Sequence, residues 1–130
     1  MERFDQILDK KRWMGREYTK RLSGLELLQL PVEQSWARHV YWMYGLVLDE
    51  SKGMDAQEFA KRLRVAGVET RPFFLGMHEQ PVFHERGLFV NERYPVAERI
   101  ARQGLYLPSG LALSESQLDE VCLAIRKVLA

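Results

Sequence analysis

The sequence predicts an α+β fold, in which a small antiparallel sheet is packed with helices. The first of three supporting observations is a run from His39 to Leu48 that is aromatic and β-branched. Both its odd-numbered and its even-numbered positions carry apolar side chains, as in a central strand that is covered on both faces. The second is a set of amphipathic stretches with helix-capping residues. The third is the length of 130 residues, 46% of them hydrophobic, which predicts a single domain over residues 1–130.

The helix predictions depend on apolar spacing and on residues that begin or end helices. Residues 2–22 carry apolar side chains at roughly helical spacing, interrupted at Lys11 and Gly15, and Gly24 is available for a left-handed cap. Glu58 and Gln117 stand three residues after potential N-caps, which is the capping-box pattern. A helix is therefore expected to begin after Asp55 and end at Gly67, and another to begin at Pro95 and end at Gly104. The last helix is expected to begin after Ser114.

Short extended segments are expected between the helices, at residues 25–30, 68–71 and 105–107. Pro72 disfavours helix at the residue before it, and Pro31 and Pro108 close the other two segments. In the long aromatic run, Tyr41, Trp42 and Tyr44 are predicted to lie in the core. Cys122, on the apolar side of the last helix, is expected to be a small buried residue and not a nucleophile.

Composition argues against several classes of function. A net charge of +1 and a pI near 7.9 give no sign of a nucleic-acid or acidic-membrane partner. The three histidines are scattered, with no cysteine or carboxylate at ligand spacing, so no metal site is expected. A lone cysteine fits a reducing compartment. With no signal peptide and no apolar run long enough to cross a bilayer, a cytoplasmic protein is expected.

The stretch from Gly67 to Phe83 is the strongest candidate for function. It begins at an expected helix end, runs briefly as an extended segment, and becomes a loop that holds two aromatics, a histidine and two prolines. Loops of this kind carry binding and catalytic residues more often than the elements that support them.

Two parts of the chain resemble the DegT/DnrJ/StrS sugar aminotransferases. The run Gly67-Val-Glu-Thr-Arg-Pro-Phe-Phe and the later Met77-His-Glu-Gln-Pro-Val-Phe look like the small-domain signature of that family. The run Arg102-Gln-Gly-Leu-Tyr-Leu-Pro-Ser-Gly and the later Leu113-Ser-Glu-Ser-Gln-Leu-Asp-Glu-Val are similar to its C-terminal end. The resemblance covers essentially the whole chain and is nearest to the GDP-perosamine synthases.

The resemblance implies the C-terminal small domain of a fold type I enzyme that depends on pyridoxal phosphate (PLP). Such enzymes transfer an amino group, usually from glutamate, to a keto-sugar nucleotide, and they are homodimers. Their PLP-binding large domain, with its Schiff-base lysine, precedes the part seen here, and no lysine of this sequence stands in a similar motif. We therefore expect no catalytic, cofactor-binding or metal-binding residue here, and no transamination by this chain alone.

In the intact enzyme that the resemblance implies, the candidate substrate-binding residues are His78, Phe73, Phe74 and Arg71. His78 would hydrogen-bond the sugar or a phosphate, or else cap a backbone carbonyl. Phe73 and Phe74 would wall the pocket, although neighbours on an extended segment point to opposite faces, so at least one is expected in the core. Arg71 would pair with a carboxylate or phosphate, or else form a surface ion pair with Glu69.

Two other interpretations remain open on the sequence. One is a free-standing α+β binding or regulatory domain, and the other is a partner subunit that completes a split aminotransferase. A free-standing domain predicts a surface without large apolar patches, whereas docking on a large domain predicts exposed apolar area. Trp13 and Trp36 have no predicted place in the core and are candidates for contacting that large domain.

Overall fold

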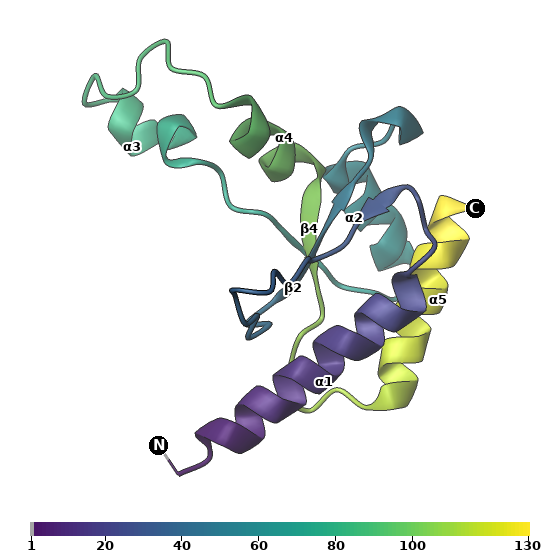
Figure 1. Ribbon diagram of the computed structural model, residues 1–130. Helices are drawn as coiled ribbons and strands as arrows, with labels where there is room; N and C mark the ends of the chain where they lie inside the picture. The colour runs from purple at the N-terminus through teal and green to yellow at the C-terminus, as the bar shows by residue number, and fades with distance from the viewer. Residues whose placement is uncertain (1) are drawn as a thin grey trace.

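The structure is a computed structural model that describes residues 2–130, and it contains a four-stranded sheet with helices packed on it (Figure 1). This confirms the predicted fold class. The elements in chain order are α1 (Phe4–Leu22), β1 (Leu28–Gln29), β2 (Tyr44–Leu48), η1 (Glu50–Lys52), α2 (Ala56–Val65), β3 (Arg71–Pro72), η2 (Met77–Glu79), α3 (Pro81–His84), α4 (Pro95–Gln103), β4 (Gly104–Leu107) and α5 (Glu115–Leu129).

The sheet has the strand order β1-β2-β4-β3, and every neighbouring pair is antiparallel. Tyr44 of β2 lies opposite Leu107 of β4, so β2 is a central strand, as predicted. The two-residue β3 forms one edge of the sheet. Pro72 fits there because an edge strand tolerates the loss of one backbone donor.

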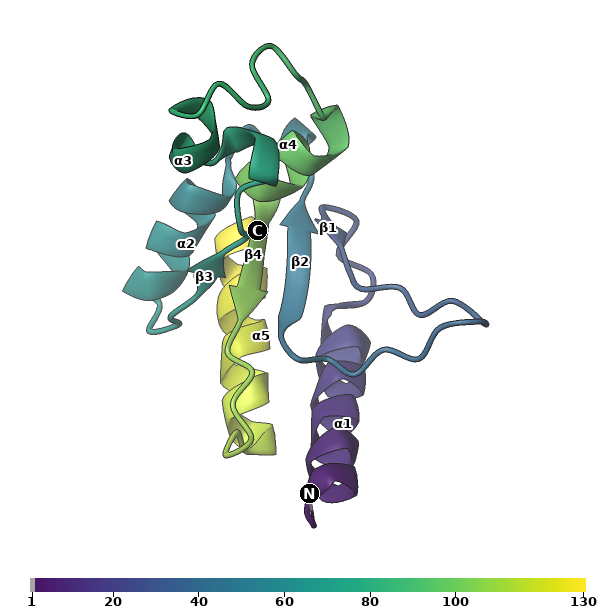
Figure 2. The ribbon, with the colours of Figure 1, turned by 90° about the vertical axis from the view of Figure 1, so that its left-hand side faces the viewer.

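The core lies between one face of the sheet and the helices α1, α2 and α5 (Figure 2). Alternate residues of β2 point to this face and are fully buried. The ring of Tyr18 on α1 lies 4.9 Å from the ring of Tyr44, which fixes α1 over β2. The other large, fully buried side chains are Met14, Leu22, Leu46, Leu48, Phe59, Leu63, Leu105, Leu118 and Ile125. Cys122 is also buried, as predicted.

Helix ends follow the capping residues of the sequence. The Asp55 carboxylate accepts the backbone N–H of Glu58 at 2.8 Å, and Ser114 forms a reciprocal capping box with Gln117. Each cap satisfies backbone donors that a helix start leaves without partners. Gly24 and Gly67, with φ of 83° and 84°, both have the left-handed conformation that ends a helix.

The predicted strand at residues 39–48 is wrong in its first half. Tyr41 has a left-handed backbone with φ of 49°, which interrupts the alternation assumed for a continuous strand, and β2 begins only at Tyr44. Tyr41 and Tyr44 are buried as predicted, but Trp42 is 67% exposed. The ring of Tyr41 packs instead on α1, where a Cβ at Gly15 would lie 2.5 Å from it. That close approach explains why glycine interrupts the apolar stripe of α1.

Candidate functional site

The face of the sheet opposite the core helices, called here the open face, carries exposed aromatic side chains. Strand register places Gly45, Tyr106 and Arg71 side by side on it. Trp42 and Phe74, which are 67% and 69% exposed, extend this surface at its two ends. In Figure 1 the open face lies on the left, between the loop that carries α3 and the N-terminal end of α1. On this side of β2, Gly45 lies under the Phe73 ring and Val47 is 7% exposed, so the prediction that both faces of the central strand are covered holds for β2 itself.

Phe73 lies flat on the open face because two glycines make room for it. A Cβ at Gly45 would lie 2.7 Å from the ring, and one at Gly104 would lie 2.4 Å from it. The ring also stacks on Tyr106 with 4.4 Å between centroids, while that of Phe74 lies 6.0 Å from Tyr106. Both phenylalanine rings thus lie beside Tyr106. Phe73 is half-buried and Phe74 is exposed, and neither belongs to the core, so the expectation that at least one lies there is wrong.

Arg71 presents its guanidinium on the same surface. Glu69, the predicted ion-pair partner, binds Arg64 at 3.2 Å instead. Across residues 2–130, Arg71 forms no ion pair and no side-chain hydrogen bond. It lines a hollow of about 410 Å³ together with Trp42 and Tyr106. Glu69, Thr70 and Ser109 also line this hollow. An unpaired, planar guanidinium is suited to binding a carboxylate or a phosphate.

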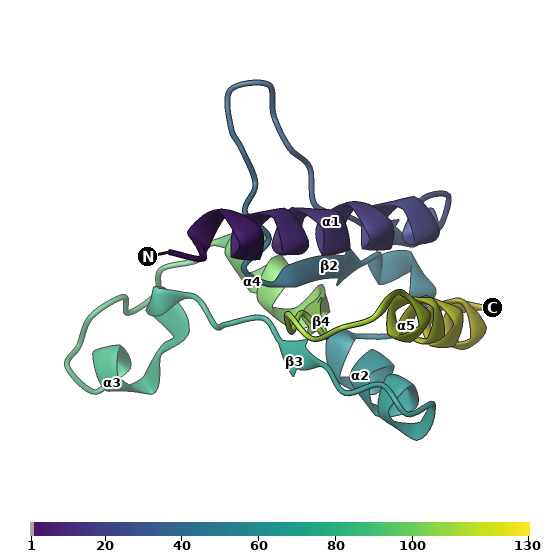
Figure 3. The same ribbon diagram turned by 90° about the horizontal axis from the view of Figure 1, so that it is seen from below.

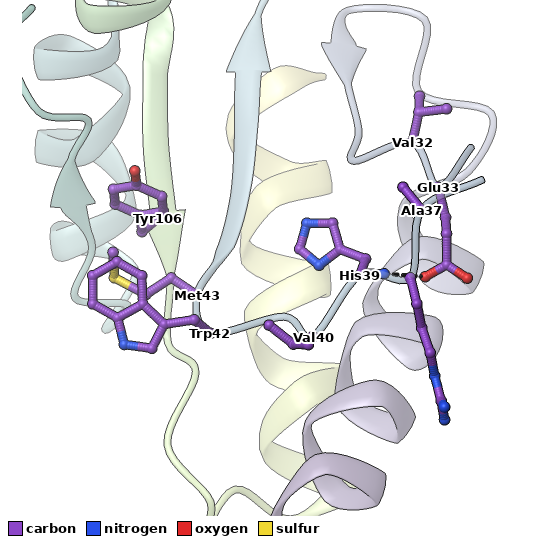
Figure 4. Close-up of a pocket in the computed structure, with 9 residues that line it drawn as sticks. Val32, Glu33, Ala37, His39, Val40, Trp42, Met43 and Tyr106 are labelled. Carbon is purple, nitrogen blue, oxygen red and sulfur yellow. Dashed lines mark hydrogen bonds between the residues drawn. The ribbon is translucent and has the colours of Figure 1, made fainter. Parts of the chain in front are cut away.

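A second hollow, of about 400 Å³, shares Trp42, Met43 and Tyr106 with the first (Figure 4). Its outer wall comes from the loop between β1 and β2, which projects away from the body of the protein (Figure 3). Within that loop, Trp36 is 83% exposed, whereas Trp13 on α1 packs against the core.

An ion pair fixes the base of this projecting loop. The Arg12 guanidinium binds both carboxylate oxygens of Glu33, at 3.0 and 3.1 Å. Glu33 also accepts the backbone N–H of His39 at 2.7 Å. These hydrogen bonds, that from Arg12 first, lower the pKa of the Glu33 carboxyl. The loop is thus held to α1 near the open face.

His78 lies apart from the open-face group. Its side chain is 8% exposed, with Nε2 3.4 Å from the Glu98 carboxylate and the ring 4.7 Å from that of Tyr94. The imidazole therefore contacts a carboxylate and not a backbone carbonyl, so the predicted alternative role as a carbonyl cap is not the one it has here. It lines a polar hollow of about 610 Å³ between α4 and the preceding loop.

Three of the lysines make contacts within the chain that occupy their side-chain amines. Burial lowers the pKa of Lys11, but its ammonium donates to the backbone carbonyls of Trp42 and Ser109. Lys11 therefore fastens α1 to two loops. Lys10 lies 3.8 Å from the centroid of the Trp13 ring, and Lys52 donates to the carbonyl of Leu129. These contacts give each of the three a structural role.

Residues 2–130 lack the features of a metal site and of a membrane-spanning helix. No three or more histidine, cysteine, aspartate or glutamate side chains converge there as metal ligands would. None of the helices in that range has the length and apolar character needed to cross a membrane.

Comparison with known proteins gives a consistent result. The DegT/DnrJ/EryC1/StrS aminotransferase family matches residues 1–126. GDP-perosamine synthases of Vibrio cholerae and Caulobacter vibrioides are 29% and 30% identical over 97% and 99% of the chain. The chain spans about a third of each, 34% in both cases.

Solved structures show the same relationship. The DesV structure from S. venezuelae, described as a complex with a ketimine intermediate, matches 98% of the chain with a TM-score of 0.85 and 25% identity. The aminotransferase TlmJ from Streptoalloteichus hindustanus matches 98% with a TM-score of 0.82 and 26% identity. Again the chain covers only 33% of either protein.

Proposed function

The chain belongs to the DegT/DnrJ/EryC1/StrS aminotransferase family, and from that premise we propose that it is the C-terminal small domain of a PLP-dependent sugar aminotransferase. The intact enzyme would transfer an amino group, from glutamate, to a keto-sugar nucleotide. The observation that carries this proposal is a family match over residues 1–126 in a chain that spans a third of its relatives. PLP and its lysine would belong to the part of the enzyme outside this third.

The open face is the surface on which we propose that the large domain docks. It combines exposed apolar side chains with hollows on both sides of Trp42. Exposed apolar area of this kind marks interaction surfaces, and it disfavours a free-standing domain with a closed surface. A large domain would cover this apolar surface equally well whether it belongs to the same polypeptide or to a separate subunit. We further propose that the intact enzyme is a homodimer, to which the exposed Trp36 of the projecting loop would contribute.

The four sequence-predicted site residues fall into two roles in this proposal. Arg71 and Phe74 are exposed on the open face and would contact the substrate directly, with Arg71 binding a carboxylate or phosphate oxygen. Phe73 and His78 are more buried and would act by holding the segment that carries them.

Two measurements test the proposal together. The natural polypeptide should be much heavier than 15.2 kDa, or co-purify with a separate large domain, and should aminate a keto-sugar nucleotide with glutamate and PLP. The 130-residue chain by itself should not aminate the sugar nucleotide and should not bind PLP through a lysine. Transamination by the purified chain, or an absorbance band of PLP bound to one of its lysines, would overturn the proposal. So would a natural 15.2 kDa monomer with no docking partner.

A further inference from the structure

The segment between β3 and α4 is held to the rest of the protein in an unusual way. Among residues 74–97, His78 is the one buried side chain, and none of these residues belongs to the hydrophobic core. Large apolar side chains of the segment, including Leu75, Met77 and Val90, are exposed. A segment with so little apolar burial needs polar contacts to keep one position.

Those polar contacts converge on Glu98, in the first turn of α4. The Arg93 guanidinium binds both carboxylate oxygens, at 2.7 to 3.1 Å, and the backbone N–H of Tyr94 donates to Oε1 at 2.9 Å. Nε2 of His78, which is buried and has no hydrogen-bond partner in the described chain, lies 3.4 Å from Oε1. The Glu98 side chain is 14% exposed and that of Arg93 is 78% exposed, so the carboxylate is partly shielded from water while the guanidinium is not.

One turn later on α4, Arg102 completes the arrangement. Its guanidinium binds Glu79, the residue after His78, and donates to the backbone carbonyl of Glu98 at 3.2 Å. The Tyr94 ring lies 4.7 Å from the ring of His78. Residues 78–79 are therefore attached to Glu98 and Arg102 of α4, and residues 93–94 are attached to Glu98.

We propose that Glu98 is a positioning residue that clamps residues 76–94 onto α4 and thereby fixes the side of the open face that Phe74 occupies. The link to substrate binding rests on the proposed function, but the clamp itself does not. An isolated surface ion pair contributes little. Glu98 differs because one carboxylate of low exposure accepts hydrogen bonds from both a guanidinium and a backbone N–H, with Nε2 of His78 3.4 Å away. The same contacts, with Arg93 first and the Tyr94 N–H second, lower the pKa of Glu98 to about 2.

Amide hydrogen exchange of the 130-residue chain tests the clamp. In Glu98→Ala, exchange at residues 76–94 should accelerate at least about tenfold, while β2 and β4 keep their protection. Glu98→Gln should retain part of the protection, because its amide oxygen can still accept the Tyr94 N–H. Glu92→Ala is the matched control, since Glu92 is in the same segment but is exposed and contacts only the Tyr94 hydroxyl, at 2.6 Å.

A spectroscopic signature adds a second readout. The ring current of Tyr94, whose ring lies 4.7 Å from that of His78, should displace the NMR signals of the His78 ring protons. This displacement should vanish in Glu98→Ala and persist in Glu92→Ala. Unchanged exchange at residues 76–94 in Glu98→Ala would overturn the proposal, as would an equal acceleration in β2 and β4. Failure of the intact enzyme to aminate a sugar would alter neither readout, so the clamp and the proposed function can fail separately.

Discussion

Gly45 is the residue on which the shape of the open face depends most directly. Replacing it with alanine would place a Cβ 2.7 Å from the far end of the Phe73 ring, which must then move off Tyr106. We expect Gly45→Ala to lower the free energy of unfolding by about 1 to 2 kcal/mol, as overpacking does. Urea denaturation followed by circular dichroism measures the change.

Two further variants show whether Phe73 is the cause of that loss. In a Phe73→Ala background the cost of Gly45→Ala should largely disappear, because the ring that it would contact is gone. Gly110→Ala is the control, since a Cβ there meets no atom within 4 Å. An equal cost of Gly45→Ala with and without Phe73 would contradict this explanation.

Arg71 gives the second prediction at this scale, tested in the intact enzyme. Loss of one charge-assisted contact to an anionic substrate should raise KM in Arg71→Ala by about 10- to 100-fold, with a smaller change in kcat. Arg71→Lys should restore only part of the affinity, because lysine lacks the planar pair of donors. Arg64→Ala is the control, since Arg64 is exposed and pairs with Glu69. If Arg71→Ala has the KM of the wild type, Arg71 does not bind the anion.

At the scale of secondary-structure elements, the ends of α5 and α2 illustrate how local the helix signals are. Each cap lies within three residues of the groups that it satisfies, so the sequence predicts it without knowledge of the rest of the fold. The strands are different. Because β1 and β3 have two residues each, they exist only through pairing with β2 and β4.

The cap of α5 supports a prediction of its own. Ser114→Ala removes the acceptor for the Gln117 N–H and should lower the free energy of unfolding by about 1 kcal/mol. Ser35→Ala, in the exposed projecting loop, should leave stability unchanged. Thermal and urea denaturation of both variants provide the comparison, and equal stability of the two would show that the box contributes nothing.

At the scale of the whole molecule, buried tyrosines should make folding sensitive to alkaline pH. Burial raises the pKa of Tyr44 to about 12 and raises that of Tyr18 further, so the folded state favours their neutral forms. The stability that this provides is complete below the ordinary tyrosine pKa of about 10 and is lost as the pH rises toward 12.

Urea denaturation at pH 8, 9, 10 and 11 measures this dependence. The free energy of unfolding should begin to decline above about pH 9, because burial also raises the pKa of the Cys122 thiol to about 11, and it should decline further above about pH 10. The decline above about pH 10 should be shallower in Tyr44→Phe. Absorbance at 295 nm should show Tyr18 and Tyr44 ionising together with unfolding. Ionisation of all five tyrosines in the folded state at pH 10.5 would contradict the burial argument.

Much of the candidate site was predictable from the sequence, but its arrangement was not. The stretch from Gly67 to Phe83 carries the family signature and three of the residues that meet on or beside the open face. Gly45 and Tyr106 were missed as partners of Phe73, because only strand register brings positions 45, 73 and 106 together. Glu98 was missed for a similar reason. Its partners come from the irregular segment between β3 and α4, whose course cannot be predicted from a repeating pattern of apolar residues.

The sequence by itself determined the family, the helices with their caps, the central place of β2 and the burial of Cys122. These depend on motifs and on contacts between residues a few positions apart. Only the tertiary structure decided that Trp42 is exposed, that Arg71 lacks its predicted partner, and that His78 is buried against Glu98. Each of these depends on a backbone turn or on a contact between side chains that no periodic pattern encodes: the left-handed Tyr41, the Arg64–Glu69 ion pair, and the approach of His78 to α4.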